Sequence, residues 1–260
     1  DAAKIKENED LQFLSTPSMK IVMFYLDTKS DAPLKDKRVR QAIEYAIDKE
    51  GIVQAVCYGY GTVAYAIVPD SVTEYKEVKE PHEYNLEKAK ELMKEAGYEN
   101  GFSMEIWTSS VQTNTEICQV VQEQLAAINI EAEILVQDAN TIDTRVDAGD
   151  EYGLSLHFYS CNSGHAEYTL SNILPTGTLR NDSRFSNPEY DAKYEEWLVT
   201  VDEKKRDELL TRMYEIQNEE TPVIPLYNEV KILGATKNLD GFQLSRIGAH
   251  EYTNAVVYEE

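Results

Sequence analysis

One short segment gathers side chains that could do chemistry. His157, Cys161 and His165 place two imidazoles and a thiol within nine residues. Such donors bind transition metals, and a thiol paired with a histidine is a common nucleophilic arrangement. However, the spacing differs from standard zinc motifs. No Asn or Asp is obviously placed to orient a histidine, and no oxyanion-type glycine loop lies beside Cys161. We therefore expect no metal, no cofactor and no enzyme activity.

The segment is positioned by a predicted strand and a predicted loop. Residues 152–159 alternate as a strand, and an irregular loop over 160–187 follows. Loops of that length inside a compact domain usually serve a function. Upstream, a strand (102–108), a helix (114–128) and a strand (129–137) form a β-α-β unit, for which a right-handed parallel crossover is the default.

Other patterns complete an α/β arrangement. Apolar residues over 16–28 predict a strand, and helical spacing with capping residues predicts helices that begin after Asp36, Asp48, Asn85 and Asp202 and at Asn187-Pro188. A short helix is expected over 141–148, and two strands separated by polar turns over 222–228 and 231–236. We expect one α/β core between about residues 16 and 245.

Composition excludes several classes of protein. The 260 residues carry 25 basic and 47 acidic side chains, a net charge of −22. This balance disfavours binding to nucleic acid or to anionic membranes. No apolar run approaches the roughly 20 residues of a membrane span. The three cysteines, an odd number without a CxxC pair, argue against a disulfide framework.

Six successive blocks resemble one family, and one of them is a helix that ends in LAAINIEAEI. The other five are PLKDKRVRQAIEYAIDKEGIVQAVCYGYGTVA, YNLEKAKELMKEAGYENGF, FSNPEYDAKYEEW, VDEKKRDELLTRMYEIQNEETPVIPLY and LDGFQ. In order and in content they are similar to the extracytoplasmic solute-binding proteins of family 5, the peptide/nickel-type receptors of ABC importers. The resemblance implies a periplasmic-binding-protein-like class II lobe, with a mixed, mostly parallel sheet flanked by helices.

The resemblance also implies an organisation and a setting. The matching blocks belong to the C-terminal half of such receptors, so residues 1–260 are expected to form one distal lobe (domain III), with hinge strands at both ends and the N-terminal half of the receptor absent. We expect a small solute as ligand, a peptide above all, and an ABC-importer permease as partner. The location implied is extracytoplasmic, with membrane contact only through a lipid anchor on the missing N-terminus.

In receptors of this kind the solute lies between two lobes, against strand ends and the loops after them. This selects Trp107 and Ser109 after one strand and Phe158, Tyr159, Cys161 and Asn162 after another. Trp107, Phe158 and Tyr159 are expected to be exposed when the other lobe is absent, although an aromatic side chain at a strand end can equally belong to the core. Arg145 is similar to an arginine that meets ligand carboxylates in some peptide receptors, or it pairs with Asp143 or Asp147.

The position of Cys161 bears on the ligand. Peptide-binding relatives are similar in carrying an aspartate there, which pairs with the peptide ammonium group. With Cys161 in its place, we expect no preference for peptides with a free N-terminus; Glu167 would substitute only if the loop folds back. Oligosaccharide and metal-chelate receptors share the scaffold and remain alternatives, as does a Cys/His-dependent enzyme.

Overall fold

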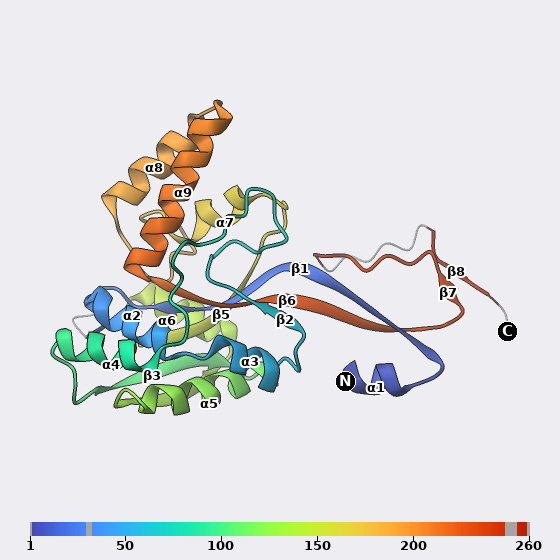
Figure 1. Ribbon diagram of the computed structural model, residues 1–260, viewed down its shortest axis with the longest axis horizontal. Coiled ribbons are helices and arrows are strands. Elements are labelled where there is room, and N and C mark those ends of the chain that lie inside the picture. The colour runs from blue at the N-terminus through green and yellow to red at the C-terminus, as the bar shows by residue number, and fades with distance from the viewer. Residues whose placement is uncertain (1, 30–32, 248–253, 259–260) are drawn as a thin grey trace.

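The structure is a computed structural model that describes residues 2–29, 33–247 and 254–258. Its centre is a six-stranded sheet with the order β2-β6-β1-β5-β3-β4 (Figure 1). The strands are β1 (Leu11–Leu26), β2 (Gly61–Val63), β3 (Phe102–Ser109), β4 (Ile130–Gln137), β5 (Leu154–Ser160) and β6 (Val223–Thr236). A separate pair joins β7 (Leu239–Asp240) to β8 (Val256–Val257).

The sheet is mixed, as expected, but it is not mostly parallel. Only β3 with β4 and β3 with β5 run parallel, whereas β1 with β5, β1 with β6 and β2 with β6 are antiparallel. The parallel part is the predicted β-α-β unit and its continuation, in which helices make the crossovers. The antiparallel part forms because β1 and β6, from opposite ends of the chain, pair directly along most of their length.

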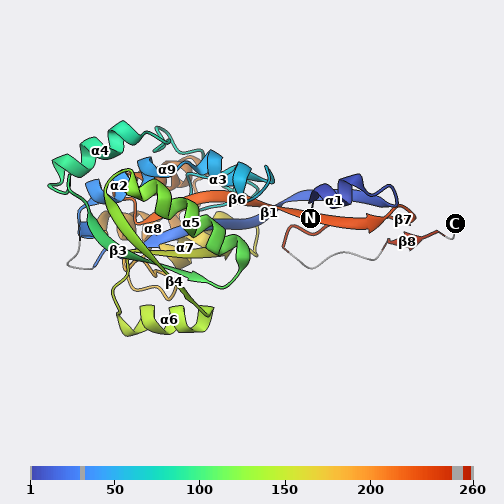
Figure 2. The ribbon, with the colours of Figure 1, turned by 90° about the horizontal axis from the view of Figure 1, so that it is seen from below.

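Helices cover both faces of the sheet. The first face carries α2 (Lys37–Ala46), α3 (Lys49–Ala55), α4 (Leu86–Glu95) and α5 (Gln112–Ala126). The second carries α6 (Ala139–Ala148), α7 (Ala166–Ile173), α8 (Pro188–Val199) and α9 (Glu203–Glu220). Figure 2 shows α6 and α4 on opposite sides of the sheet. Two short helices, α1 (Ala2–Glu7) and the 3-10 helix η1 (Pro33–Lys35), complete the described elements.

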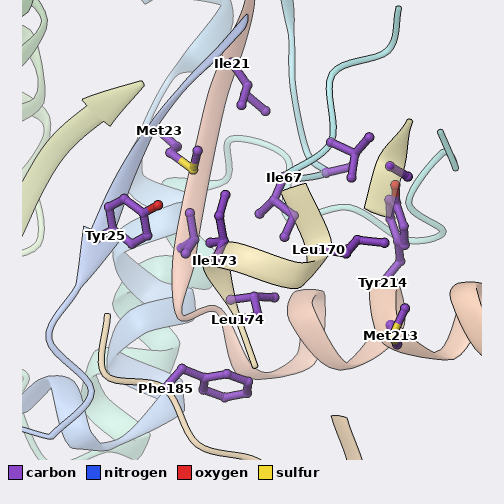
Figure 3. Packing of buried hydrophobic residues seen from close by; sticks show 14 of the residues in the cluster. Ile21, Met23, Tyr25, Ile67, Leu170, Ile173, Leu174, Phe185, Met213 and Tyr214 are labelled. Carbon is purple, nitrogen blue, oxygen red and sulfur yellow. The ribbon is translucent and has the colours of Figure 1, made fainter. Parts of the chain in front are cut away.

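Alternation along β1 supplies both cores. Val22, Phe24 and Leu26 pack into the first core, while Ile21, Met23 and Tyr25 pack into the second. Figure 3 shows the second core, in which these side chains meet residues of α7 and α9 such as Leu170 and Met213. Because both faces are covered, β1 reads as a continuous apolar run rather than an alternating one.

Predicted helix starts are confirmed by their caps. The side chains of Asp36, Asp48, Asn85 and Asp202 each accept a hydrogen bond from a backbone N–H in the first turn of α2, α3, α4 and α9. Asn187 does the same for α8, which has proline in its first turn. These caps act through neighbours two or three residues away, so local sequence is enough to locate them.

Two local predictions differ from the structure. The loop expected over 160–187 contains α7, whose buried residues Ala166, Thr169, Leu170 and Ile173 form one helical stripe. The two strands expected over 222–228 and 231–236 are one strand, β6. The polar residues Asn228 and Glu229 indicated a turn, but they pair with Thr62 and Gly61 of β2 and so continue the strand.

The ends of β1 and β6 extend beyond the other strands as a two-stranded ribbon (Figure 1). Leu11 to Pro17 pair with Thr236 to Val230, and the register shifts between Pro17 and Ile21, where β1 enters the core. Helix α1 packs on this ribbon: a Cβ added at Gly234 would lie 3.0 Å from the side chain of Ile5. Glycine at position 234 therefore permits the close approach of α1.

Candidate functional site

A hollow lies where the ribbon meets the core, and we call it the hinge hollow. It consists of two adjoining spaces of about 250 and 410 Å³ that share Met19, Arg246 and Ile247. The smaller space is also lined by Lys20, Ser160, Glu229 and Lys231, and the larger by Thr16, Asn162, Ser163, Gly164, Gln243, Leu244 and Ser245. Strands β1, β5 and β6, the β5–α7 loop and the segment after β7 therefore converge at this place.

Backbone hydrogen bonds around Met19 hold the walls of the hinge hollow together. The Met19 carbonyl accepts from the Cys161 N–H at 2.7 Å, and the Met19 N–H donates to the Arg246 carbonyl at 3.1 Å. The Ser18 hydroxyl accepts from the Lys20 N–H at 3.1 Å, within the register shift of β1. The irregular part of β1 thus links the β5–α7 loop on one side to the segment containing Arg246 on the other.

The β5–α7 loop folds back on β5. The Gly164 N–H donates to the Cys161 carbonyl, and Gly164 has a φ of 73°, a left-handed conformation that glycine adopts without strain. As a result, the rings of Tyr159 and Tyr168 lie 5.8 Å apart. Asn162 is exposed at the tip of the loop, and Glu167 is exposed in the first turn of α7. The loop therefore folds back on β5, and a role for Glu167 in ligand binding stays a prediction.

The residues considered for metal binding and nucleophilic chemistry do not form a reactive cluster. The Cys161 thiol is buried and donates to the His165 carbonyl at 3.0 Å. His157 lies with Nε2 2.7 Å from the Ser155 hydroxyl, and burial lowers its pKa to about 4. Among the residues that the structure describes, no three His, Cys, Asp or Glu side chains are arranged to hold a metal ion.

Trp107 and Arg145 form a separate cluster between β3 and α6. Trp107 is fully buried and donates from Nε1 to Glu105 at 2.7 Å, so the expectation that it is exposed is wrong. The cause is α6, whose Arg145 places its guanidinium 4.0 Å from the centre of the Trp107 ring. Arg145 pairs with Asp150 at 2.8 Å rather than with Asp143 or Asp147, and also donates to Gln137.

The remaining predicted residues lie apart from one another. The Ser109 hydroxyl accepts a hydrogen bond from Asn114 at 2.9 Å, at the start of α5. Phe158 is 59% exposed, as expected, and Tyr159 is half-buried. Because neighbouring side chains of a strand point to opposite faces, these two aromatics cannot contact one small ligand on the same face.

The structure thus distributes the seven predicted residues over distinct places. Asn162 lines the hinge hollow, with Tyr159 and Cys161 beside it on the same loop and strand, and Phe158 lies against Lys20 of that hollow. Trp107 and Arg145 form the β3–α6 cluster, and Ser109 lies elsewhere. Ligand contact by these residues stays a prediction. A ligand would reach Trp107 or Cys161 only after a rearrangement, because neither side chain is exposed.

Sequence reasoning missed the charged residues of the hinge hollow: Lys20, Glu229, Lys231 and Arg246. Lys20 did offer a signal, since it interrupts the apolar run of β1. Its Nζ lies 2.8 Å from Glu229 and 4.2 Å from the centre of the Phe158 ring. Glu229 and Arg246 follow polar residues, where a charged residue is ordinary, whereas Lys231 lies between Val230 and Ile232.

Comparison with known proteins places this geometry in context. Residues 1–179 match the family model described as bacterial extracellular solute-binding proteins, family 5 Middle. The glutathione-binding protein GsiB of Escherichia coli K12 is 32% identical over 251 residues, which are 93% of this chain and 48% of that protein. The chain thus spans about half the length of the curated relatives it matches.

Solved structures give the same picture. HbpA2 from Haemophilus parasuis superposes with a TM-score of 0.87 at 26% identity, over 99% of this chain and 52% of that one. A dipeptide-binding protein from Pseudoalteromonas sp. SM9913 in complex with Met-Leu gives 0.85 at 25% identity, over 98% and 52%. Within the described residues, none of the helices has both the length and the apolar character that crossing a bilayer requires.

Proposed function

Because the chain belongs to the bacterial extracellular solute-binding proteins of family 5, we propose that it forms one lobe of a receptor that delivers a small solute to an ABC-importer permease. The receptor acts by binding alone, without covalent chemistry, outside the cytoplasm. A lipid anchor in a preceding part of the protein would hold it at the membrane. Residues 11–15 lie in the ribbon, Arg246 and Ile247 line the hinge hollow, and the core between them is the lobe proper.

The single observation that carries this proposal is the β1–β6 ribbon with the hinge hollow at its base. Two strands that leave a core side by side make few contacts with that core beyond the point where they leave it. They can therefore absorb a change of direction, which is the structural basis of a hinge. A solute held at their base would contact both lobes. Closure would then remove water from it and strengthen its polar contacts.

A peptide-like solute fits the residues around this place best. Tyr159 and Tyr168 offer flat aromatic surface, Asn162 offers an amide donor and acceptor, and Glu167 offers a carboxylate. The relatives named for glutathione and crystallised with Met-Leu support the same class. Oligosaccharides and metal chelates are the alternatives within this scaffold.

The test is calorimetry of the full-length receptor that contains this chain, titrated with glutathione, Met-Leu, maltotriose and a nickel–histidine chelate. We expect micromolar affinity, about −8 kcal/mol, for a peptide probe. Small-angle scattering should show a smaller radius of gyration for the bound receptor. Binding of maltotriose or the chelate alone would select an alternative ligand class, and peptide binding without compaction would contradict hinge closure.

The role of the peptide ammonium group is tested with N-acetyl-Met-Leu. Since Cys161 stands where relatives carry an aspartate, the expected result is equal affinity for the free and acetylated dipeptides. If acetylation instead weakens binding, and Glu167→Gln removes the difference, then Glu167 supplies the ammonium partner from the folded-back α7. Ser171→Ala, on the same helix, serves as the control.

A further inference from the structure

Positive charge gathers at the hinge hollow of a strongly acidic protein. Over the whole chain acidic residues outnumber basic ones, 47 to 25. The smaller space of the hinge hollow reverses this ratio, because Lys20, Lys231 and Arg246 line it together with a single carboxylate, that of Glu229. Three cations around one hollow repel one another unless an anion lies between them.

The one carboxylate neutralises only one of the three cations. Lys20 lies 2.8 Å from Glu229, and the Ser18 hydroxyl also donates to Glu229. Lys231, two residues further along β6, forms no ion pair within residues 2–29, 33–247 and 254–258. It is half-buried, so its charge is less well screened than that of a lysine on open surface.

Arg246 is held in place without being neutralised. Its Nε donates to the Pro17 carbonyl at 3.3 Å and one terminal nitrogen donates to the Ser71 carbonyl at 2.6 Å. Both acceptors are uncharged. The other terminal nitrogen has no acceptor among the described residues, which leaves an oriented guanidinium donor at the hollow.

We propose that the hinge hollow is a binding site for a carboxylate group of the solute, with Arg246 and Lys231 as the binding residues. This inference rests on the proposed function, because it names the ligand chemistry of the same cleft. Glu229 holds Lys20 over the Phe158 ring, and its negative charge reduces the net positive charge of the hinge hollow. A carboxylate would accept from Lys231 and from the free Arg246 nitrogen, both charge-assisted hydrogen bonds.

The test compares Met-Leu with Met-Leu amide, and glutathione with its glycine amide, on the full-length receptor. We expect amidation to weaken binding roughly 10- to 100-fold, the effect of losing charge-assisted hydrogen bonds. Lys231→Met should reduce this difference, because only Arg246 then binds the carboxylate. Lys237→Met, a matched change in charge at the exposed end of the ribbon, should leave it intact. Equal affinity for acid and amide, or a difference of unchanged size in Lys231→Met, overturns the proposal.

A second measurement separates this inference from the proposed function. If the receptor binds no peptide, the proposed ligand class fails, but the hinge hollow can still be titrated with succinate while the Arg246 Nε–H resonance is followed by NMR. A saturable shift that Lys231→Met weakens supports a carboxylate site. No shift overturns it, as does a shift with inorganic phosphate alone, which would indicate an anion site of different chemistry.

Discussion

Two of the lysine–glutamate pairs in this protein, one in the first core and one at the hinge hollow, differ in kind. In the first core, Lys49 Nζ lies 2.8 Å from Glu44, and His82 Nδ1 lies 2.9 Å from the other oxygen of the same carboxylate. The Lys49 and Glu44 side chains are only 3% and 2% exposed. At the hinge hollow, Lys20 and Glu229 are equally close, but they are 26% and 30% exposed and two further cations lie beside them.

The difference shows how a closed charge network can be told from an open one. Lys49 also donates to the Ala64 carbonyl and lies 4.3 Å from the centre of the Tyr65 ring, so its charge is satisfied from several sides. Burial alone would raise the pKa of Glu44, but the charge of Lys49 and the hydrogen bond with His82 outweigh it and lower that pKa. This network is therefore structural. The hinge hollow keeps unneutralised charge within reach of solvent, which suits ligand binding.

The largest expected effect comes from breaking the closed network. Glu44→Ala leaves Lys49 buried without its partner, which should lower the free energy of unfolding by about 3–5 kcal/mol. Urea unfolding of the chain measures this change. Glu91→Ala is the control, because Glu91 forms an exposed pair with Lys88 that should contribute less than about 1 kcal/mol. A change below 1 kcal/mol for Glu44→Ala would contradict a structural role.

A half-buried histidine outside both networks sharpens the comparison through pH. Burial lowers the pKa of His157 from 6.5 to about 4, so folding favours the neutral ring. The contribution of His157 to the free energy of unfolding is fully present above pH 6.5. It is lost as the pH falls through 4, and the loss amounts to at most about 3 kcal/mol. We expect the difference in unfolding free energy between pH 7 and pH 4 to be smaller in His157→Gln. An unchanged difference would show that His157 does not control this acid sensitivity.

The open pair should matter little for stability. Glu229→Gln removes the partner of a solvent-accessible lysine, so the free energy of unfolding should change by less than about 1 kcal/mol. The same substitution frees Lys20 and should raise the affinity for succinate severalfold. Chemical denaturation and calorimetry measure the two quantities. A loss of several kcal/mol would place this pair in the same category as Glu44 and Lys49.

The smallest effect is expected at Cys161, which lies beside the hinge hollow but belongs to the closed interior. Its thiol is fully buried, so iodoacetamide at pH 7 should leave it unmodified in the folded chain, as it should Cys118, whose pKa burial raises to about 12. Cys57 is half-buried and should react first. Mass spectrometry of the native and urea-unfolded chain gives the comparison. Rapid labelling of Cys161 would show an open thiol and revive a nucleophilic role.

Local patterns were enough for much of the fold. The caps at Asp36, Asn85 and Asp202 and the β-α-β unit depend on residues close in sequence, and the structure confirms them. Helix α7 escaped detection because its apolar stripe lies in a segment rich in glycine, serine and threonine. Six of the seven predicted site residues were chosen from strand ends and the loops after them, and that rule does not tell whether a side chain is covered by another helix, as Trp107 is by α6.

By itself, the sequence determined the helices, the apolar strands and the family, because each depends on short-range spacing or on blocks read in order. Only the tertiary structure decided that β1 pairs with β6, that Trp107 is buried and that Lys20 meets Glu229, 209 residues away. Spacing along the chain does not determine how remote segments pair, because that choice depends on the free energy of packing the entire core. The charge at the hinge hollow arises from this packing.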